Sequence, residues 1–133
     1  MDVDGLRDYN RRYGHQAGDR CLKQVAQVLT EHARRAGDLV ARYGGGEFAL
    51  ILQPGSTDAE AEFCDRIRTA VEALAIPNDG SPFDGHLTVS IGAAIAVPPH
   101  DSDHHGLVAE AAKALAEAKR QGKNRVVALQ ATH

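Results

Sequence analysis

Two acidic residues and three consecutive glycines are the parts of this 133-residue chain that could carry chemistry. Asp2 and Asp4 are two residues apart, so on a strand both point to the same side and could hold a hard cation such as Mg²⁺. Gly44, Gly45 and Gly46 leave backbone without side chains, where N–H groups can contact phosphate oxygens. Each feature also has a simpler interpretation, because aspartate is common in turns and glycines occur in flexible turns.

Other polar residues are of types that suit a guanine nucleotide. Near the ends of predicted helices, Asp19 could accept hydrogen bonds from the ring N–H and amino groups of guanine, and the Asn10 amide could contact its carbonyl. Lys119 and Lys123 flank the end of the last predicted helix and could bind phosphates. The alternative is purely structural, since acids at helix starts and cations at helix ends interact favourably with the helix dipole.

A third group is the Arg-x-x-Asp pair formed by Arg35 and Asp38. Arginine can donate two hydrogen bonds to O6 and N7 of guanine, while aspartate accepts from its N–H groups. The alternative is a helix-end ion pair that contributes little to stability. The residues alone favour the ion pair.

The hydrophobic pattern predicts the elements that must position these residues. Apolar residues spaced three and four apart indicate helices, and short apolar runs indicate strands. The two runs around the glycines predict a β-hairpin. The expected order is β-α-α-β-β-α-β-α-β: strands near 1–4, 39–41, 48–52, 87–97 and 125–129, and helices near 5–13, 17–35, from 57, and 106–121. This order predicts a single α+β domain over residues 1–133, with a mixed, largely antiparallel five-stranded sheet covered by helices.

Composition narrows the function classes. The formal net charge is −3 and no basic run exceeds two residues, so contact with nucleic acid or a membrane surface is not expected. Cys21 and Cys64 lie among apolar residues, which predicts buried free thiols and a reducing, cytoplasmic location. The chain opens inside its first predicted strand, so we expect it to be part of a longer protein, which could be tethered to a membrane elsewhere.

Taken together, the motifs resemble the GGDEF domain family of diguanylate cyclases, over almost the whole chain and in the same order and spacing. The matching segments are Asp2-Val3-Asp4, Asn10, Gly14-His15-x-x-Gly18-Asp19, Arg42-Tyr43-Gly44-Gly45-x-Glu47-Phe48, Thr88-Val89-Ser90-Ile91-Gly92 and Ala118-Lys119-x-x-Gly122-Lys123-Asn124. The resemblance implies a fold related to nucleotidyl cyclases and polymerase palm domains. It also implies an activity, the condensation of two GTP molecules into cyclic di-GMP across a homodimer, with Mg²⁺.

The resemblance assigns roles position by position. Asp2 and the Val3 carbonyl would hold the metal, with Asp2 and Glu47 as the catalytic carboxylates. The substrate residues would be Arg7, Asn10, Asp19, Gly44, Gly45, Gly46, Lys119 and Lys123. Arg7 stands where the family usually has lysine. The product site would consist of Arg35, Asp38 and Arg66.

One position departs from the family pattern. Gly46 stands where the family has an aspartate or glutamate that supports the metal. Glu47 follows directly, but neighbouring residues on a strand point to opposite faces, so the sequence argues against Glu47 as a substitute. The resulting hypothesis is an impaired cyclase that binds cyclic di-GMP at the Arg-x-x-Asp site. The alternatives are an active cyclase and a structural dimerisation module.

Overall fold

The computed structural model describes residues 1–34, 38–42, 44–52, 56–95 and 104–130. Its elements follow the order that the sequence predicts. They are β1 (Asp2–Val3), α1 (Leu6–Tyr13), α2 (His15–His32), β2 (Leu39–Arg42), β3 (Phe48–Ile51), α3 (Thr57–Ala73), β4 (Val89–Ile95), α4 (His104–Arg120) and β5 (Val126–Gln130).

The strands form a mixed sheet in two parts. β1 pairs antiparallel with β4, β4 pairs parallel with β5, and β2 and β3 form a separate antiparallel hairpin. A single antiparallel bridge between Asp2 and Glu47 joins the two parts. The described residues therefore form a three-stranded and a two-stranded sheet, not the one continuous five-stranded sheet predicted, because β1 has only two residues to pair with the hairpin.

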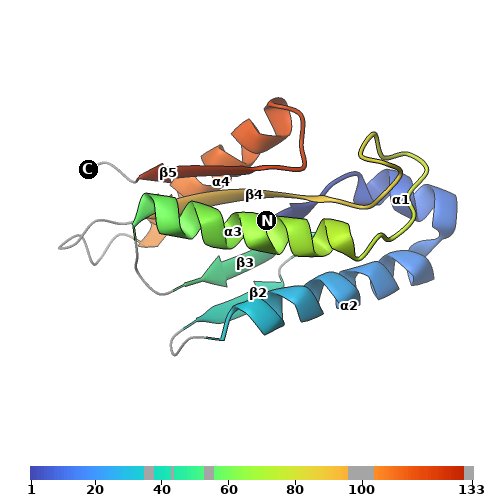
Figure 1. Ribbon diagram of the computed structural model, residues 1–133, viewed down its shortest axis with the longest axis horizontal. Helices are drawn as coiled ribbons and strands as arrows, with labels where there is room; N and C mark the ends of the chain where they lie inside the picture. The colour runs from blue at the N-terminus through green and yellow to red at the C-terminus, as the bar shows by residue number, and fades with distance from the viewer. Residues whose placement is uncertain (35–37, 43, 53–55, 96–103, 131–133) are drawn as a thin grey trace.

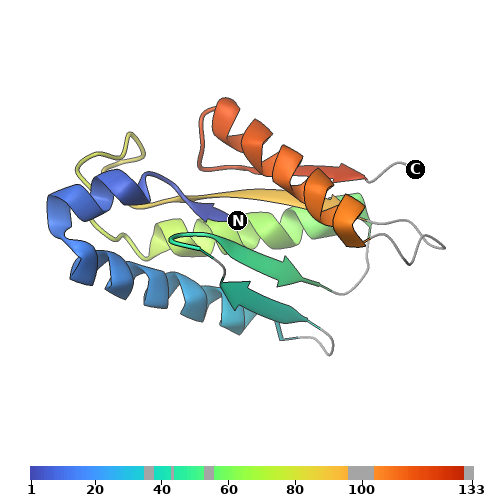
Figure 2. The same cartoon turned by 180° about the vertical axis from the view of Figure 1, so that it is seen from behind.

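Helices cover both faces of this sheet. α2 and α3 lie on one face and α4 on the other, as the two opposite views show (Figures 1 and 2). α4 approaches β4 unusually closely at Gly92, where an added Cβ would lie 2.1 Å from the backbone nitrogen of Leu115. The parallel pairing of β4 with β5 follows from this arrangement, because the intervening helix crosses over the sheet and returns the chain in the same direction.

The core lies between the sheet and the pair α2 and α3. Val25 and Leu29 of α2 and Ile67 and Val71 of α3 are almost completely buried, in agreement with the spacing of apolar residues in the sequence. Leu74, which follows α3 and continues the same spacing of apolar residues, is 38% exposed.

Local signals fix the helix ends. α3 begins where the Ser56 hydroxyl accepts a hydrogen bond from the Ala59 backbone N–H at 3.0 Å. α4 ends before Gly122, whose φ of +127° is open to glycine alone among ordinary residues. Within the described ranges, none of the helices is long and apolar enough to cross a bilayer.

Candidate functional site

The first strand and the glycine turn lie side by side. The Val3 backbone N–H donates to the Gly46 carbonyl at 2.9 Å, and the Phe48 N–H donates to the Met1 carbonyl at the same distance. A Cβ added to Gly46 would lie 3.5 Å from Oδ1 of Asp2. We call the group formed by Asp2, Gly44–Gly46, Glu47 and Lys119 the cradle.

Glu47 occupies a different position from the one that the sequence argument gave it. Residues directly opposite each other in an antiparallel pair project to the same face, and Glu47 is opposite Asp2. The sequence argument compared Glu47 with Gly46, but Gly46 precedes β3 and its Cβ would also lie near Asp2, so strand alternation does not exclude Glu47 from the side of Asp2. The two carboxylates therefore share one face of the sheet, and Glu47 is exposed there.

Asp4 is not available as the second cation ligand that the Asp-x-Asp spacing indicated. Asp4 is only 8% exposed, and its carboxylate accepts three hydrogen bonds. The donors are the hydroxyl of Thr88 at 2.8 Å, the hydroxyl of Ser90 at 2.7 Å and the backbone N–H of Asn124 at 3.0 Å. These hydrogen bonds connect the end of β1 to β4 and to the turn before β5. The Asp4 carboxylate is therefore occupied in holding the fold together.

A cation closes the cradle from α4. Lys119, in the last turn of that helix, forms an ion pair with the Asp2 carboxylate. The Lys119 side chain is 39% exposed and that of Asp2 18% exposed, so the pair lies at the rim of the cradle. Lys123 follows in the turn after α4 and is exposed. Both cations predicted to bind phosphate thus lie on the segment that contacts β1.

Asn10 and Gly18 meet where α1 packs against α2. A Cβ on Gly18 would lie 1.9 Å from Oδ1 of Asn10, so only glycine leaves room for this amide. The same oxygen is buried and lacks a hydrogen-bond partner within the described parts of the chain. An unsatisfied buried acceptor is costly, which marks Asn10 as a place where a ligand can supply a donor.

The remaining predicted nucleotide residues lie on the same two helices. Asp19 follows Gly18 on α2 and is exposed, and Arg7 is exposed in the first turn of α1. Leu6, beside Arg7, connects this region to the cradle, because its Cδ2 would lie 2.8 Å from a Cβ on Gly46.

The structure describes only part of the predicted product site. Arg35 lies outside the described residues, and Asp38 is half-buried immediately before β2. Arg66 is on α3, where its guanidinium lies 5.6 Å from the centre of the Phe63 ring, a cation–π contact.

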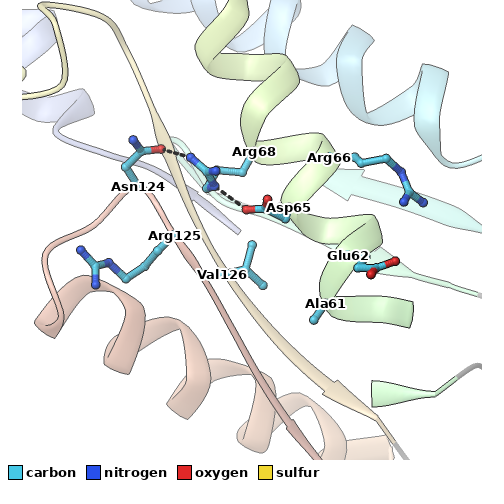
Figure 3. A pocket seen from close by; sticks show the side chains of 8 residues that line it. All are labelled: Ala61, Glu62, Asp65, Arg66, Arg68, Asn124, Arg125 and Val126. Carbon is cyan, nitrogen blue, oxygen red and sulfur yellow. Dashed lines mark hydrogen bonds and ion pairs between the residues drawn. The ribbon is translucent and has the colours of Figure 1, made fainter. Parts of the chain in front are cut away.

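A groove of about 680 Å³ lies away from the cradle, between α3 and the start of β5. Its lining residues are Ala61, Glu62, Asp65, Arg66, Arg68, Asn124, Arg125 and Val126. Arg68 crosses it and donates to Asp65 at 2.7 Å and to Asn124 at 3.0 Å, whereas Arg66 extends from the other side of α3 (Figure 3). The sequence analysis did not predict the contact of Arg68 with Asn124, because the two residues are 56 positions apart and no local pattern indicates it.

The cysteines are free and buried, as the sequence predicted. Burial raises the pKa of the Cys64 thiol to about 11. Burial, and then a hydrogen bond with Cys21, raises the pKa of Tyr9 to about 12. These groups belong to the core and do not titrate near neutral pH.

The comparison with known families decides the identity of the chain. Residues 1–125 match the family described as "Diguanylate cyclase, GGDEF domain". The chain belongs to the GGDEF family. This match covers both the cradle and the Asn10–Gly18 contact.

Curated relatives agree with this assignment. The GGDEF chain is 39% identical over 129 residues to diguanylate cyclase A of Treponema denticola, and 36% identical over 126 residues to diguanylate cyclase DosC of Escherichia coli K12. Each alignment covers 95% of this chain, but only 33% and 26% of the respective relative. The chain thus spans about a third or less of the length of these relatives.

Solved structures share the fold. The GGDEF domain of DgcB from Caulobacter crescentus, determined in complex with c-di-GMP, is 34% identical and superimposes with a TM-score of 0.80, covering 96% of this chain and 73% of that one. The active GGEEF domain of a diguanylate cyclase from Vibrio cholerae also gives a TM-score of 0.80, with the same 96% of this chain and 78% of that chain covered. At 23% identity, the second comparison supports the fold alone.

The cradle of this GGDEF domain has the chemistry of a partial Mg²⁺ site. Asp2 and Glu47 are opposite each other across the bridge, so their carboxylates lie on one face, and Val3 of β1 bonds Gly46 of the glycine turn through its backbone N–H. Among the described residues, no three His, Cys, Asp or Glu side chains form a metal-binding group. Mg²⁺ commonly binds one or two carboxylates together with substrate phosphates, so these donors fit a metal that arrives with a nucleotide.

Proposed function

We propose that this GGDEF domain is an impaired diguanylate cyclase that binds cyclic di-GMP through Arg35, Asp38 and Arg66. GTP binding is retained at Asn10 and Asp19. The observation that carries the proposal is the bare Gly46 beside Asp2, since residue 46 has no carboxylate although its Cβ would lie 3.5 Å from Oδ1 of Asp2.

The charges of the cradle support the proposal that Gly46 lowers the rate of the cyclase reaction more than it lowers the affinity for GTP. GGDEF cyclases generally use a divalent metal, which neutralises phosphate charge when bound. Asp2, the Val3 carbonyl and Glu47 would hold it here. Asp2 is already paired with Lys119, and Glu47 is exposed to solvent, so the anionic field is weaker than three acids would provide. Removing such a group costs about 10²- to 10⁴-fold in rate, by analogy with the loss of a general base.

Guanine recognition does not depend on Gly46. Asn10 has an unsatisfied buried acceptor, and Asp19 is exposed one residue beyond Gly18. Oδ1 of Asn10 and the Asp19 carboxylate can accept from the N–H groups of guanine, and Nδ2 of Asn10 can donate to an acceptor of the base. Lys119 and Lys123 would neutralise the phosphates.

Binding of cyclic di-GMP is supported by the DgcB GGDEF domain, which was solved with that ligand. Calorimetric titration with cyclic di-GMP tests the proposal. The wild-type chain should bind, and Arg35→Ala or Arg66→Ala should weaken binding about tenfold or more, because each removes charge-assisted hydrogen bonds. Arg11→Ala, which removes an exposed arginine of α1 outside the site, is the matched control and should bind normally. A wild-type chain with no affinity for cyclic di-GMP contradicts the proposal, and a chain that binds neither cyclic di-GMP nor GTP would favour a structural dimerisation module.

A second candidate function is an active cyclase, in which two facing copies of the domain each hold one GTP. The observation in its favour is the pairing of Asp2 with Glu47 on one face of the sheet, which leaves two carboxylates for a metal. Production of cyclic di-GMP from GTP and Mg²⁺ by the wild-type protein, at a rate unchanged by Gly46→Asp, would establish this function.

A further inference from the structure

The turn between α4 and β5 has an unusual backbone. Lys123 and Asn124 have φ angles of +68° and +48°, directly after Gly122 at +127°. The left-handed conformation costs a residue other than glycine about 1 kcal/mol or more, with asparagine the most tolerant. Strain of this kind persists only where surrounding contacts hold it in place.

Asn124 is held through its backbone N–H and both polar atoms of its side-chain amide. Its backbone N–H donates to Oδ2 of Asp4, its side-chain Nδ2 donates to Oε2 of Glu72, and its Oδ1 accepts from Nη1 of Arg68, each at 3.0 Å. Figure 3 shows Arg68 reaching from α3 to this amide. Asn124 thus connects β1 and α3, two elements distant in the sequence, to one turn.

Asp2 of β1 and Asp4, just after β1, hold the segment on either side of Lys123. Asp2 pairs with Lys119 before the turn, and Asp4 accepts from Asn124 after it. Lys123 itself is exposed, and its backbone N–H donates to the Ala118 carbonyl at 3.0 Å. Its backbone is therefore fixed by its neighbours while its ammonium group remains accessible.

Glu72 orients the amide of Asn124. Its side chain is 33% exposed and also lies 3.5 Å from Arg68, which is 17% exposed. A carboxylate accepts only and a guanidinium donates only, so the pair sets the amide in one orientation. Arg68 is in turn fixed by Asp65 at 2.7 Å.

We propose that Glu72, Arg68 and Asn124 form a positioning group that holds the Lys119–Lys123 segment against the phosphates of a bound nucleotide. The affinity of the chain for a triphosphate then depends on α3 residues that touch no nucleotide. This inference rests on the proposed binding of GTP, and it extends that proposal to residues outside the cradle.

Calorimetric titrations with GTP and with GMP test the positioning group. Glu72→Ala should lower GTP affinity about tenfold, the effect of losing one hydrogen bond to a charged group, and should lower GMP affinity less than about twofold. Glu72→Gln keeps an oxygen acceptor for Asn124 and should stay within about threefold of wild type. Glu62→Ala, the same change about three turns earlier on α3, is the matched control and should bind both nucleotides normally.

A second variant guards against a general loss of structure. Asn124→Gly keeps a residue that adopts positive φ readily but removes the amide, so it should show the same selective loss while the chain still unfolds in one cooperative thermal transition. Equal losses for GTP and GMP, or unchanged GTP binding in both variants, would overturn the inference while leaving the proposed function intact. A wild-type chain that binds neither nucleotide would overturn both.

Discussion

Oδ1 of Asp2 lies 3.5 Å from the position that a Cβ would take on Gly46. An aspartate at residue 46 would therefore place its carboxylate next to that of Asp2, at the end of β1. Glycine leaves this place empty of charge, and Lys119 balances the acid that remains. We therefore propose that the catalytic state of the domain depends on this one missing side chain, at a position whose backbone lies beside β1.

The contact between Asn10 and Gly18 predicts that substitution of either residue weakens guanine binding. Asn10→Ala should weaken GTP binding about 10- to 100-fold, because the base loses a buried polar partner. Gly18→Ala should weaken it similarly, since its Cβ would lie 1.9 Å from Oδ1 of Asn10 and must displace the amide. Titration with GTP and with ATP measures both effects. ATP binding that falls by the same factor as GTP binding would contradict a role in reading guanine.

The close packing at Gly92 predicts that a substitution there lowers stability, although Gly92 is not one of the candidate site residues. A Cβ at this position would lie 2.1 Å from the backbone nitrogen of Leu115 and 2.4 Å from the carbonyl oxygen of Ala111, and backbone atoms cannot move aside as a side chain can. Gly92→Ala should lower the free energy of unfolding by about 2–3 kcal/mol or more. Urea denaturation measures the change. Gly45→Ala is the control, because nothing lies within 4 Å of its added Cβ; equal stability of the two variants would refute the close packing of α4 on β4.

The raised pKa of Cys64 predicts a thiol that reacts slowly. Burial raises this pKa to about 11, so at pH 8 only about one molecule in a thousand carries the reactive thiolate. Its alkylation by iodoacetamide should be slow in the native protein, accelerate in urea, and in the native state increase with pH up to about 11. Peptide mass spectrometry follows the modification. Rapid alkylation of the native chain at pH 8 would show that Cys64 is accessible.

The sequence predicted the fold because its signals are local. The apolar spacing that buries Val25, Leu29, Ile67 and Val71 is a helical one, and the glycines between two apolar runs indicate the hairpin. The division of the sheet at β1 was not predictable in this way, since it depends on how few residues β1 has to pair with the hairpin.

The site was predicted less completely, for a physical reason. Position in a motif identified Asp2 and Lys119, which lie 117 residues apart in the sequence and meet in the structure. The Asp-x-Asp spacing wrongly indicated Asp4 as a cation ligand. Spacing treats both acids alike, but the hydroxyls of Thr88 and Ser90 donate hydrogen bonds to the carboxylate of Asp4. The sequence argument about Glu47 considered its neighbour Gly46 in the chain and could not foresee its partner Asp2 across the bridge.

The most direct test of the account is cyclic di-GMP formation from GTP and Mg²⁺ by the full protein and its Gly46 variants. The backbone of Gly46 does not require glycine, and only the flexible end of Leu6 must shift to admit a side chain. Gly46→Asp should therefore raise turnover about 10²- to 10⁴-fold above wild type. Gly46→Ala crowds Leu6 equally without adding charge and should remain as slow as wild type. Wild-type turnover equal to that of Gly46→Asp would contradict the central claim that the missing carboxylate impairs this domain.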